Sequence, residues 1–227
     1  MKETNENDSE GNFDLSISDM MSALCFIFIL VCAVLVFRLK KMSENYVTMQ
    51  QALYSELKTE FETEIKEWNI DINDDLTITF KDPKVVFPGN SADLGPAYKK
   101  ILDSFFPRLV KILSKPEYVD SIEELRIEGH TADASKNDSK EAKEIDYKEG
   151  MDLSQKRTRE VLYYCLTTDF GAENDWVKNK IIAIGYSKSK PIIINDKIDW
   201  SASRRVEFRI KTNSDKAIKE FLVNEKY

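Results

Sequence analysis

Hydrophobic positions gather in one long run near the start of the chain. Residues 20–37 contain no charged side chain, and Ser22 is the one polar side chain among them. A run of this length and purity is typical of a helix that crosses a membrane. We therefore predict a single transmembrane helix over residues 16–38, preceded by an acidic tail over residues 1–15.

The next segment, residues 39–70, has the pattern of an amphipathic helix. Its apolar side chains recur at steps of three and four, which keeps one face of a helix apolar. They are Leu39, Met42, Tyr46, Met49, Leu53, Leu57, Phe61, Ile65 and Trp68. Gly and Pro are absent, so we expect a continuous rod. The near-heptad spacing at its start favours a parallel homodimer, and packing of the helix on its own domain is the alternative.

Residues 71–212 alternate between short strand patterns and helical patterns, which predicts an α/β sandwich with a mixed sheet and helices. Strands are expected over 76–80, 84–87, 125–128, 181–184 and 205–210, and helices over 94–113 and 153–166. The polar run 133–150 is predicted to be a long exposed loop, and Pro107 to kink its helix. Residues 213–227 are expected to form a C-terminal helix, over 216–223, with a tail.

Composition narrows the classes of function. A net charge of -7 and a pI ≈ 5.0 argue against nucleic-acid binding through a positive surface. A single His and three scattered Cys are too few for a closed zinc site or a disulfide framework. The glycine-rich motifs that wrap nucleotide phosphates are missing from the sequence. We therefore expect a protein that is not an enzyme, holds no metal or cofactor and has no direct nucleic-acid partner.

The residues on either side of the apolar run indicate whether the segment is cleaved and in which direction it crosses the membrane. An acidic start, and an exit without small residues, indicate an uncleaved signal-anchor. Arg38, Lys40 and Lys41 follow the run, whereas Lys2 alone precedes it. The positive-inside rule would then place the C-terminal side in the cytoplasm. Motifs in the C-terminal part of the chain favour the opposite orientation.

Three motifs follow one another in the C-terminal part. Residues 127–133 read IEGHTAD, residues 153–161 read LSQKRTREV, and residues 203–210 read SRRVEFRI. In this order they resemble the OmpA-like peptidoglycan-binding domain, whose pattern is I-x-GHTD, then LSxxRAxxV, then NRRVEI. The resemblance covers roughly residues 76–212. It implies an α/β sandwich that binds the cell wall in the periplasm.

The resemblance also implies a binding site. Peptidoglycan stem peptides contain a zwitterionic diamino acid, so a pocket for it needs a cation for the carboxylate and an anion for the ammonium. The resemblance implies that Arg157 is the ligand-binding arginine and that Arg204 and Arg205 form a second basic pair. Thr131, in the first motif, is expected to belong to the same site.

The sequence departs from the family pattern at the acid. Ala132 stands where the family has Asp, and Asp133 could replace it if the loop slips by one residue. A structural role for Arg157 is the alternative, with its guanidinium paired to Glu128 or another carboxylate. His130 is expected to brace the loop, because no nucleophile motif accompanies it.

The beginning of the apolar run carries a second resemblance. Residues 14–24 read DLSISDMMSAL, which resembles the MotB type of ion-driven stator subunit, and Asp19 matches the ion-carrying carboxylate of that type. A charged side chain at the centre of an apolar span costs about 2.5–3.5 kcal/mol, so such residues usually face a pathway. The alternative is a helix start, in which Ser16 caps the helix and Asp19 lies in its first turn.

The same opening, together with Phe-Phe-Pro at residues 105–107, resembles the ZorB family of Zorya anti-phage defence systems. This resemblance implies an ion-conducting stator subunit of a proton-driven rotary motor, a dimer inside a pentameric MotA-like partner, ZorA. The transported ion is H⁺ or Na⁺. The chain would cross the bacterial inner membrane once, with a cytoplasmic N-terminus and a periplasmic domain anchored to peptidoglycan. A flagellar MotB-type stator and a passive envelope tether are the alternatives.

Overall fold

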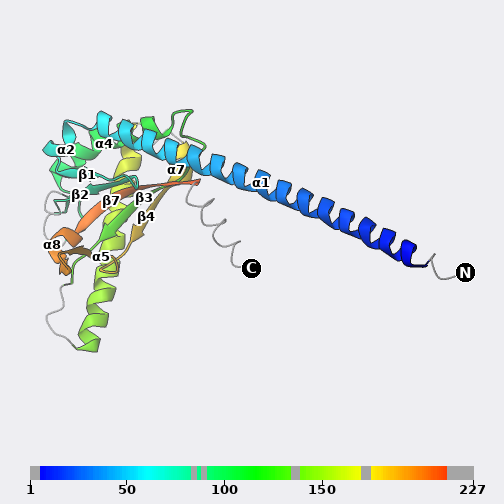
Figure 1. Ribbon diagram of the computed structural model, residues 1–227. Coiled ribbons are helices and arrows are strands. Elements are labelled where there is room, and N and C mark those ends of the chain that lie inside the picture. The colour runs from blue at the N-terminus through cyan, green and yellow to red at the C-terminus, as the bar shows by residue number, and fades with distance from the viewer. Residues whose placement is uncertain (1–5, 83–85, 88–90, 134–138, 170–174, 214–227) are drawn as a thin grey trace, which may run out of the picture. The chain divides into compact units, whose positions relative to one another are not determined.

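The computed structural model describes residues 6–82, 86–87, 91–133, 139–169 and 175–213 (Figure 1). The chain divides into two compact units, Met1–Val47 and Thr48–Tyr227.

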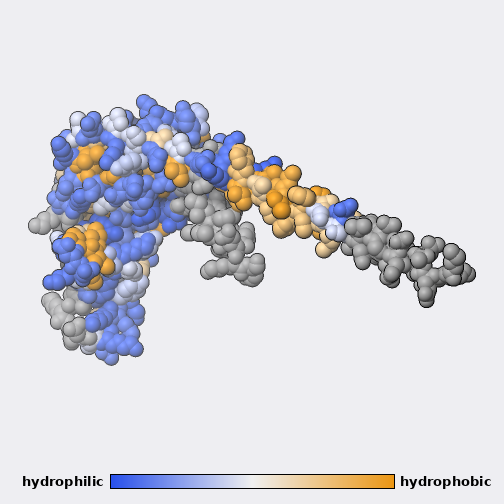
Figure 2. All heavy atoms as spheres, in the orientation of Figure 1, coloured by the Kyte–Doolittle hydropathy of each residue, from blue (hydrophilic) through white to orange (hydrophobic). Residues whose placement is uncertain are grey.

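The first unit consists of helix α1 (Glu6–Glu60), which continues into the second unit. Its segment Ser18–Lys41 has a mean hydropathy of 2.9 and no buried residues, and it is the one described helix long and apolar enough to cross a membrane. The apolar side chains of this segment form a continuous exposed surface in Figure 2. Length and composition therefore agree with a single membrane-spanning helix.

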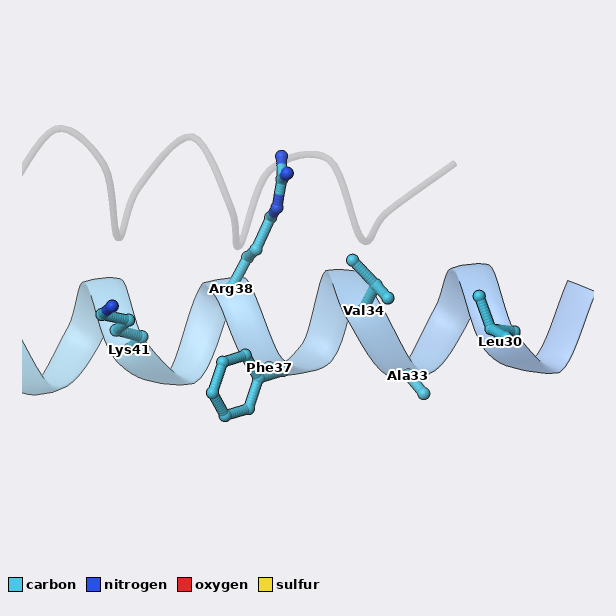
Figure 3. Close-up of a pocket in the computed structure, with 6 residues that line it drawn as sticks. All are labelled: Leu30, Ala33, Val34, Phe37, Arg38 and Lys41. Carbon is cyan, nitrogen blue, oxygen red and sulfur yellow. The ribbon is translucent and has the colours of Figure 1, made fainter.

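Basic side chains mark the C-terminal end of the apolar segment (Figure 3). Arg38 extends from the side of α1 opposite to Phe37, and Lys41 lies one turn beyond Phe37. Long basic side chains at such a position bury their aliphatic stems in the lipid and keep their charges in the headgroup region.

The second unit is built on a five-stranded mixed sheet in the order β1-β2-β7-β3-β4. Its strands are β1 (Ile70–Ile72), β2 (Thr77–Phe80), β3 (Ile122–His130), β4 (Ile181–Gly185) and β7 (Arg205–Thr212). The β3–β4 pair is parallel, and the other three pairs are antiparallel. A separate hairpin joins β5 (Ile192–Ile194) and β6 (Lys197–Asp199). The predicted mixed sheet is confirmed.

Because side chains alternate along a strand, the sheet has one apolar face and one polar face. Helices α4 (Pro96–Leu113) and α5 (Lys140–Thr167) pack in the same core as the apolar face, and α5 lies along β3 and β4 (Figure 1). The shorter helices are α2 (Glu64–Glu67), α7 (Asp175–Lys180) and α8 (Trp200–Ser203). Phe105 of α4 lies 5.3 Å from Phe80 and 5.2 Å from Phe208, measured between ring centroids.

The C-terminal part of the predicted rod belongs to the domain. Leu53, Leu57 and Phe61 are fully buried in the domain core. Nearby, Arg108 of α4 forms ion pairs with Glu60 at 2.7 Å and Glu64 at 2.5 Å. For these residues the alternative of packing on their own domain is correct. The prediction of an unbroken rod to residue 70 was wrong, because α1 ends at Glu60 and α2 and β1 follow.

The prediction of an exposed loop over 133–150 was wrong from Lys140 onward, and so was the later helix start near residue 153. Helix α5 begins at Lys140, and the Ser139 hydroxyl accepts a hydrogen bond from the Ala142 N–H at 3.2 Å. The partly or fully buried stripe here is small or polar: Ala142, Asp146, Gly150 and Ser154. A helix with such a stripe has no apolar periodicity to reveal it.

The other predictions divide into three groups. The strands over 76–80, 125–128, 181–184 and 205–210 and the helix over 94–113 are confirmed, and α4 continues through Pro107. Strand β1 and the β5–β6 hairpin were not predicted. The terminal helix over 216–223 and most of the strand over 84–87 lie outside the described residues.

Candidate ligand-binding site

A small pocket lies where the end of β3, the start of β7 and α5 meet. Its lining consists of Val86, Phe87, Gly129, His130, Arg157, Arg204, Arg205 and Val206. The three predicted arginines therefore share one pocket, although α5 and β7 are far apart in the sequence. No acidic side chain is among the lining residues that the structure describes.

Arg157 is the most deeply placed of the three arginines, at 9% exposure. Its Nε donates a hydrogen bond to the Ser91 carbonyl at 3.0 Å, and its guanidinium carbon lies 4.7 Å from the centroid of the Phe87 ring. Burial, and then the charge of Arg204, lower the pKa of Arg157. The ion-pair partner of Glu128 is Arg209, at 3.5 Å, rather than the Arg157 that the structural alternative proposed.

Arg204 and Arg205 are neighbours with different surroundings. Arg204 is the exposed C-cap of α8. Arg205 begins β7, and its Nε donates to Glu207 at 2.7 Å. One of its terminal nitrogens also donates to the carbonyl oxygens of Lys190 and Ser203. Arg205 thus fastens the strand, whereas Arg204 is exposed at the edge of the pocket.

Close packing of α5 on the sheet sets the position of Arg157. A Cβ on Gly129 would lie 2.6 Å from Thr158 Cγ2, and a Cβ on Gly185 would lie 2.6 Å from the backbone nitrogen of Gln155. Both contacts are shorter than a carbon atom allows, so glycine lets the helix come this close. The glycine in the first motif therefore has a packing role that brings the LSQKR segment to the pocket.

A buried charged network adjoins the pocket. Glu128, His130 and Glu207 each place one ligand atom within 4.8 Å of the others, a spacing that could hold a metal ion. Arg205 and Arg209 already form ion pairs with the two carboxylates, so the network has balancing cations of its own. We therefore interpret it as a brace across β3 and β7.

The ionisation of this network follows from burial and ion pairs. Burial would raise the pKa of Glu207, but the neighbouring His130 at 3.3 Å and the hydrogen bond from Arg205 lower it to about 2. Burial lowers the pKa of His130, whose ring stacks on Tyr186 at a centroid distance of 5.2 Å. These contacts fit the bracing role expected for His130.

Asp133 and Thr131 do not line the arginine pocket. The Asp133 carboxylate lies 3.2 Å from the ammonium of Lys188, which also forms an ion pair with Asp146 at 2.5 Å. Burial would lower the pKa of Lys188, but these two carboxylates raise it. Thr131 is buried, and its N–H donates to the Ser187 carbonyl at 2.8 Å. The slip that would bring Asp133 to the site of the missing acid is not seen.

Two partners of Arg157 were missed by sequence reasoning. Phe87 supports its guanidinium and Ser91 accepts its hydrogen bond, and both come from the segment before α4. The sequence pattern predicts Phe87 only as the end of a strand over 84–87. The sequence carries no signal for either contact, because Phe87 and Ser91 precede Arg157 by 70 and 66 positions.

Asp19 lies in the second predicted site, near the start of the apolar segment Ser18–Lys41. Its side chain is exposed in this single chain. Helix α1 begins at Glu6, so Ser16 and Asp19 lie inside a helix rather than at its start. The alternative in which this pair forms a helix cap is therefore wrong.

The OmpA family profile matches residues 86–205, which include Arg157, Arg204 and Arg205. Zorya protein ZorB from Escherichia coli is 33% identical over 231 residues, a stretch that covers 97% of each chain. The chain therefore belongs to the OmpA family and is a homologue of ZorB.

Two solved structures are similar to part of this chain. The cell wall anchor of the type VI secretion system (T6SS) from Pseudomonas aeruginosa is 19% identical, with a TM-score of 0.47, and the match covers 69% of this chain and 96% of that one. The periplasmic domain of Helicobacter pylori MotB is 18% identical, with a TM-score of 0.44, and covers 66% and 85%.

Proposed function

We propose that this ZorB homologue is a stator subunit of a Zorya anti-phage system, embedded in the inner membrane and anchored to peptidoglycan. The observation that carries the proposal is the identity of 33% with Zorya protein ZorB over 97% of the chain. That match includes the apolar helix as well as the OmpA-family domain, so it concerns the complete arrangement of membrane segment and wall-binding domain.

The wall-binding role is supported by the arginine pocket. Arg157, Arg204 and Arg205 converge there, within the residues that the OmpA family profile matches. Guanidinium groups bind carboxylates through paired, charge-assisted hydrogen bonds, and carboxylates are the anions that peptidoglycan stem peptides present. Arg157→Ala is therefore expected to release the protein from purified sacculi in a sedimentation assay.

Ion conduction is assigned to Asp19. An ionised carboxylate in an apolar segment is costly in lipid, and a partner subunit that supplies a polar pathway removes this cost. Asp19 would exchange H⁺, or Na⁺, at an interface with a pentameric MotA-like ZorA partner, while two copies of this chain occupy its centre. No other cofactor is required by this scheme.

The decisive experiment replaces Asp19 with Asn in cells that carry the chain together with its membrane partner. Asn keeps the size and helical position but cannot release a proton, so we expect loss of protection in a plaque assay, with normal membrane insertion and assembly. The matched control is Glu44→Gln, because Glu44 is exposed and lies beyond the apolar segment. We expect that control to protect fully.

Full protection by Asp19→Asn would refute ion conduction and favour a passive tether. In a tether the helix serves only as an anchor, so Arg157→Ala alone would abolish protection. Measuring both variants in the same assay distinguishes the two functions.

A further inference from the structure

The β5–β6 hairpin exposes apolar side chains outside the membrane segment. Residues 193–198 are all exposed, and the exposed fractions of Ile193, Ile194 and Ile198 are 64%, 49% and 45%. Figure 2 shows an apolar patch at the place where Figure 1 labels α8, the helix that follows this hairpin. Among the described strands, β5 and β6 pair only with each other, so each has a free edge. Apolar residues beside a free strand edge are typical of a surface that binds another strand.

We propose that the β6 strands of two copies of this chain pair antiparallel, with Ile198 of one copy opposite Ile198 of the other. The two hairpins would then form one four-stranded sheet in the order β5-β6-β6-β5. The proposed function brings two copies of the chain together in one motor, and the inference rests on that arrangement. The β6 pair would join the domains of the two copies.

The turn of the hairpin determines which backbone groups are free. Asn195 and Asp196 have positive φ, as a two-residue hairpin turn requires. Ile194 and Lys197 are the pair that flanks this turn, and such a pair exchanges hydrogen bonds. Because hydrogen-bonded and non-hydrogen-bonded pairs alternate, the N–H and C=O of Ile198, one position further on, point away from β5. Two copies can therefore exchange two backbone hydrogen bonds at Ile198.

The charges of β6 match in this register. With Ile198 at the centre, Lys197 of each copy lies opposite Asp199 of the other, so the interface contains this ion pair twice. Opposite charges at facing positions stabilise an antiparallel pair, and like charges destabilise it. Lysine on an edge strand usually prevents pairing, but here it meets a carboxylate of the second copy. Pairing through β5 offers no such match, because Ile192–Ile194 carries no charge.

The four-stranded sheet would also bring the exposed isoleucines together. Ile193 and Ile198 are directly opposite in the hairpin, so they lie on one face, and two copies would form a row of four isoleucines. The base of the hairpin is held to α8, because the Ile192 N–H donates to the Ser203 hydroxyl at 2.9 Å. A two-stranded hairpin is only marginally stable in water, and further strands stabilise it. A second copy supplies those strands.

Disulfide cross-linking of the full-length chain tests this register. Cells carry the chain with its membrane partner, Cys25 and Cys32 are replaced by Ala, and isolated membranes are treated with an oxidant. Ile198→Cys should form a disulfide dimer, because the facing Cα atoms would lie about 5.5 Å apart, within disulfide range. Ile193→Cys is the matched control, since it is more exposed but its two copies would lie roughly 14 Å apart, three strand spacings. We expect at least tenfold less dimer for this control on a non-reducing gel.

Charge variants of the Ile198→Cys chain make the assignment specific. Lys197→Glu places a glutamate opposite Asp199 in both pairs, so it should lower the dimer yield at least fivefold. Adding Asp199→Asn removes this repulsion and should restore most of the yield, and Asn can still cap α8 by accepting from the Ser201 N–H. Lys111→Glu makes the same change of charge at an exposed position of α4 and should leave the yield unchanged. Thermal unfolding verifies that each variant is folded.

A cysteine at Leu39, near the end of the apolar segment, tests independently for two copies. If Leu39→Cys cross-links and Ile198→Cys does not, the inference is refuted while the two-copy stator stands. If neither cross-links, the two-copy arrangement fails and the inference fails with it. Stronger cross-linking of Ile193→Cys than of Ile198→Cys would indicate pairing through β5. A product of Ile198→Cys whose mass differs from that of two chains would indicate another protein at this edge, and either result refutes the inference.

Discussion

The buried carboxylates of β3 and β7 each lie beside an arginine of β7. Glu207 is 6% exposed and accepts a hydrogen bond from Arg205, and Glu128 is fully buried beside Arg209. Glu128 and Glu207 lie directly opposite each other in the strand register, an arrangement that would be repulsive without the two arginines. Removing one member therefore leaves a buried charge without compensation.

This network predicts acid sensitivity. The Glu207 carboxyl has a pKa of about 2 in the folded protein against 4.5 ordinarily, so its stabilisation is complete above pH 4.5 and is lost as the pH falls toward 2. His130, with its pKa lowered from 6.5, acts in the same direction, because the unfolded chain takes up its proton first. We expect Glu207→Gln to lower the free energy of unfolding at pH 7 by about 3 kcal/mol and to flatten its dependence on pH below 4.5.

Urea denaturation at a series of pH values, followed by tryptophan fluorescence, measures this effect. Glu124→Gln is the matched control, because Glu124 lies on β3 but is one-third exposed and pairs with Arg126 on the same strand. Its effect should stay below about 1 kcal/mol. Equal losses for the two variants would contradict a special role of the buried network.

Among the helices and strands, the sequence predicted the elements whose buried side chains are apolar. The buried positions of α4 and of β2, β3 and β7 are rich in Phe, Leu and Ile, and periodicity located all four. The first turns of α5 were missed because Asp146 and Gly150 occupy its partly buried stripe. Asp146 forms an ion pair with Lys188, and Gly150 lies close to Ser187. Such contacts depend on a distant loop, which local spacing does not contain.

The hairpin of β5 and β6 was missed for a different reason. Asn195 and Asp196 both have positive φ, the conformation that a two-residue hairpin turn demands. In the sequence they follow three consecutive isoleucines, which do not alternate with polar residues as a half-buried strand would.

For the site, motif order predicted that Arg157, Arg204 and Arg205 belong together. The contacts of Arg157 with Phe87 and Ser91 needed three-dimensional structure.

The domain core covers only part of the apolar stripe of α1. Leu53 and Leu57 pack in the domain core, so they are not available to a homodimer. A homodimer interface would use the earlier part of the apolar pattern, which begins at Leu39. We therefore expect Leu39→Cys to form a disulfide between two copies in oxidised membranes, in a chain whose Cys25 and Cys32 are replaced by Ala. Burial raises the pKa of the Cys165 thiol, so that residue stays unreactive.

Non-reducing gel electrophoresis of those membranes measures the dimer. Lys41→Cys is the matched control, because it lies about 200° around the helix from Leu39 and should face away from the seam. Equal cross-linking of both variants would indicate random collision rather than a parallel seam.

At the scale of the whole molecule, two signals disagree about which side of the membrane the domain occupies. Arg38, Lys40 and Lys41 follow the apolar segment while Lys2 alone precedes it, and this bias would retain the domain in the cytoplasm. The cell wall lies on the other side, and the domain belongs to the OmpA family and places three arginines in one pocket. A wall-binding domain is useful only in the periplasm, so we give family and pocket the greater weight.

Alkaline phosphatase fused after Tyr227 is therefore expected to be active, since this enzyme folds only in the oxidising periplasm, and green fluorescent protein at the same place to be dark. The same two reporters fused before Met1 form the matched control and should give the reverse pattern. If green fluorescent protein fused after Tyr227 is fluorescent and alkaline phosphatase fused there is inactive, the three basic residues decide the orientation. Peptidoglycan would then be out of reach of Arg157, and the wall-anchored stator would have to be abandoned even if Asp19 proved essential.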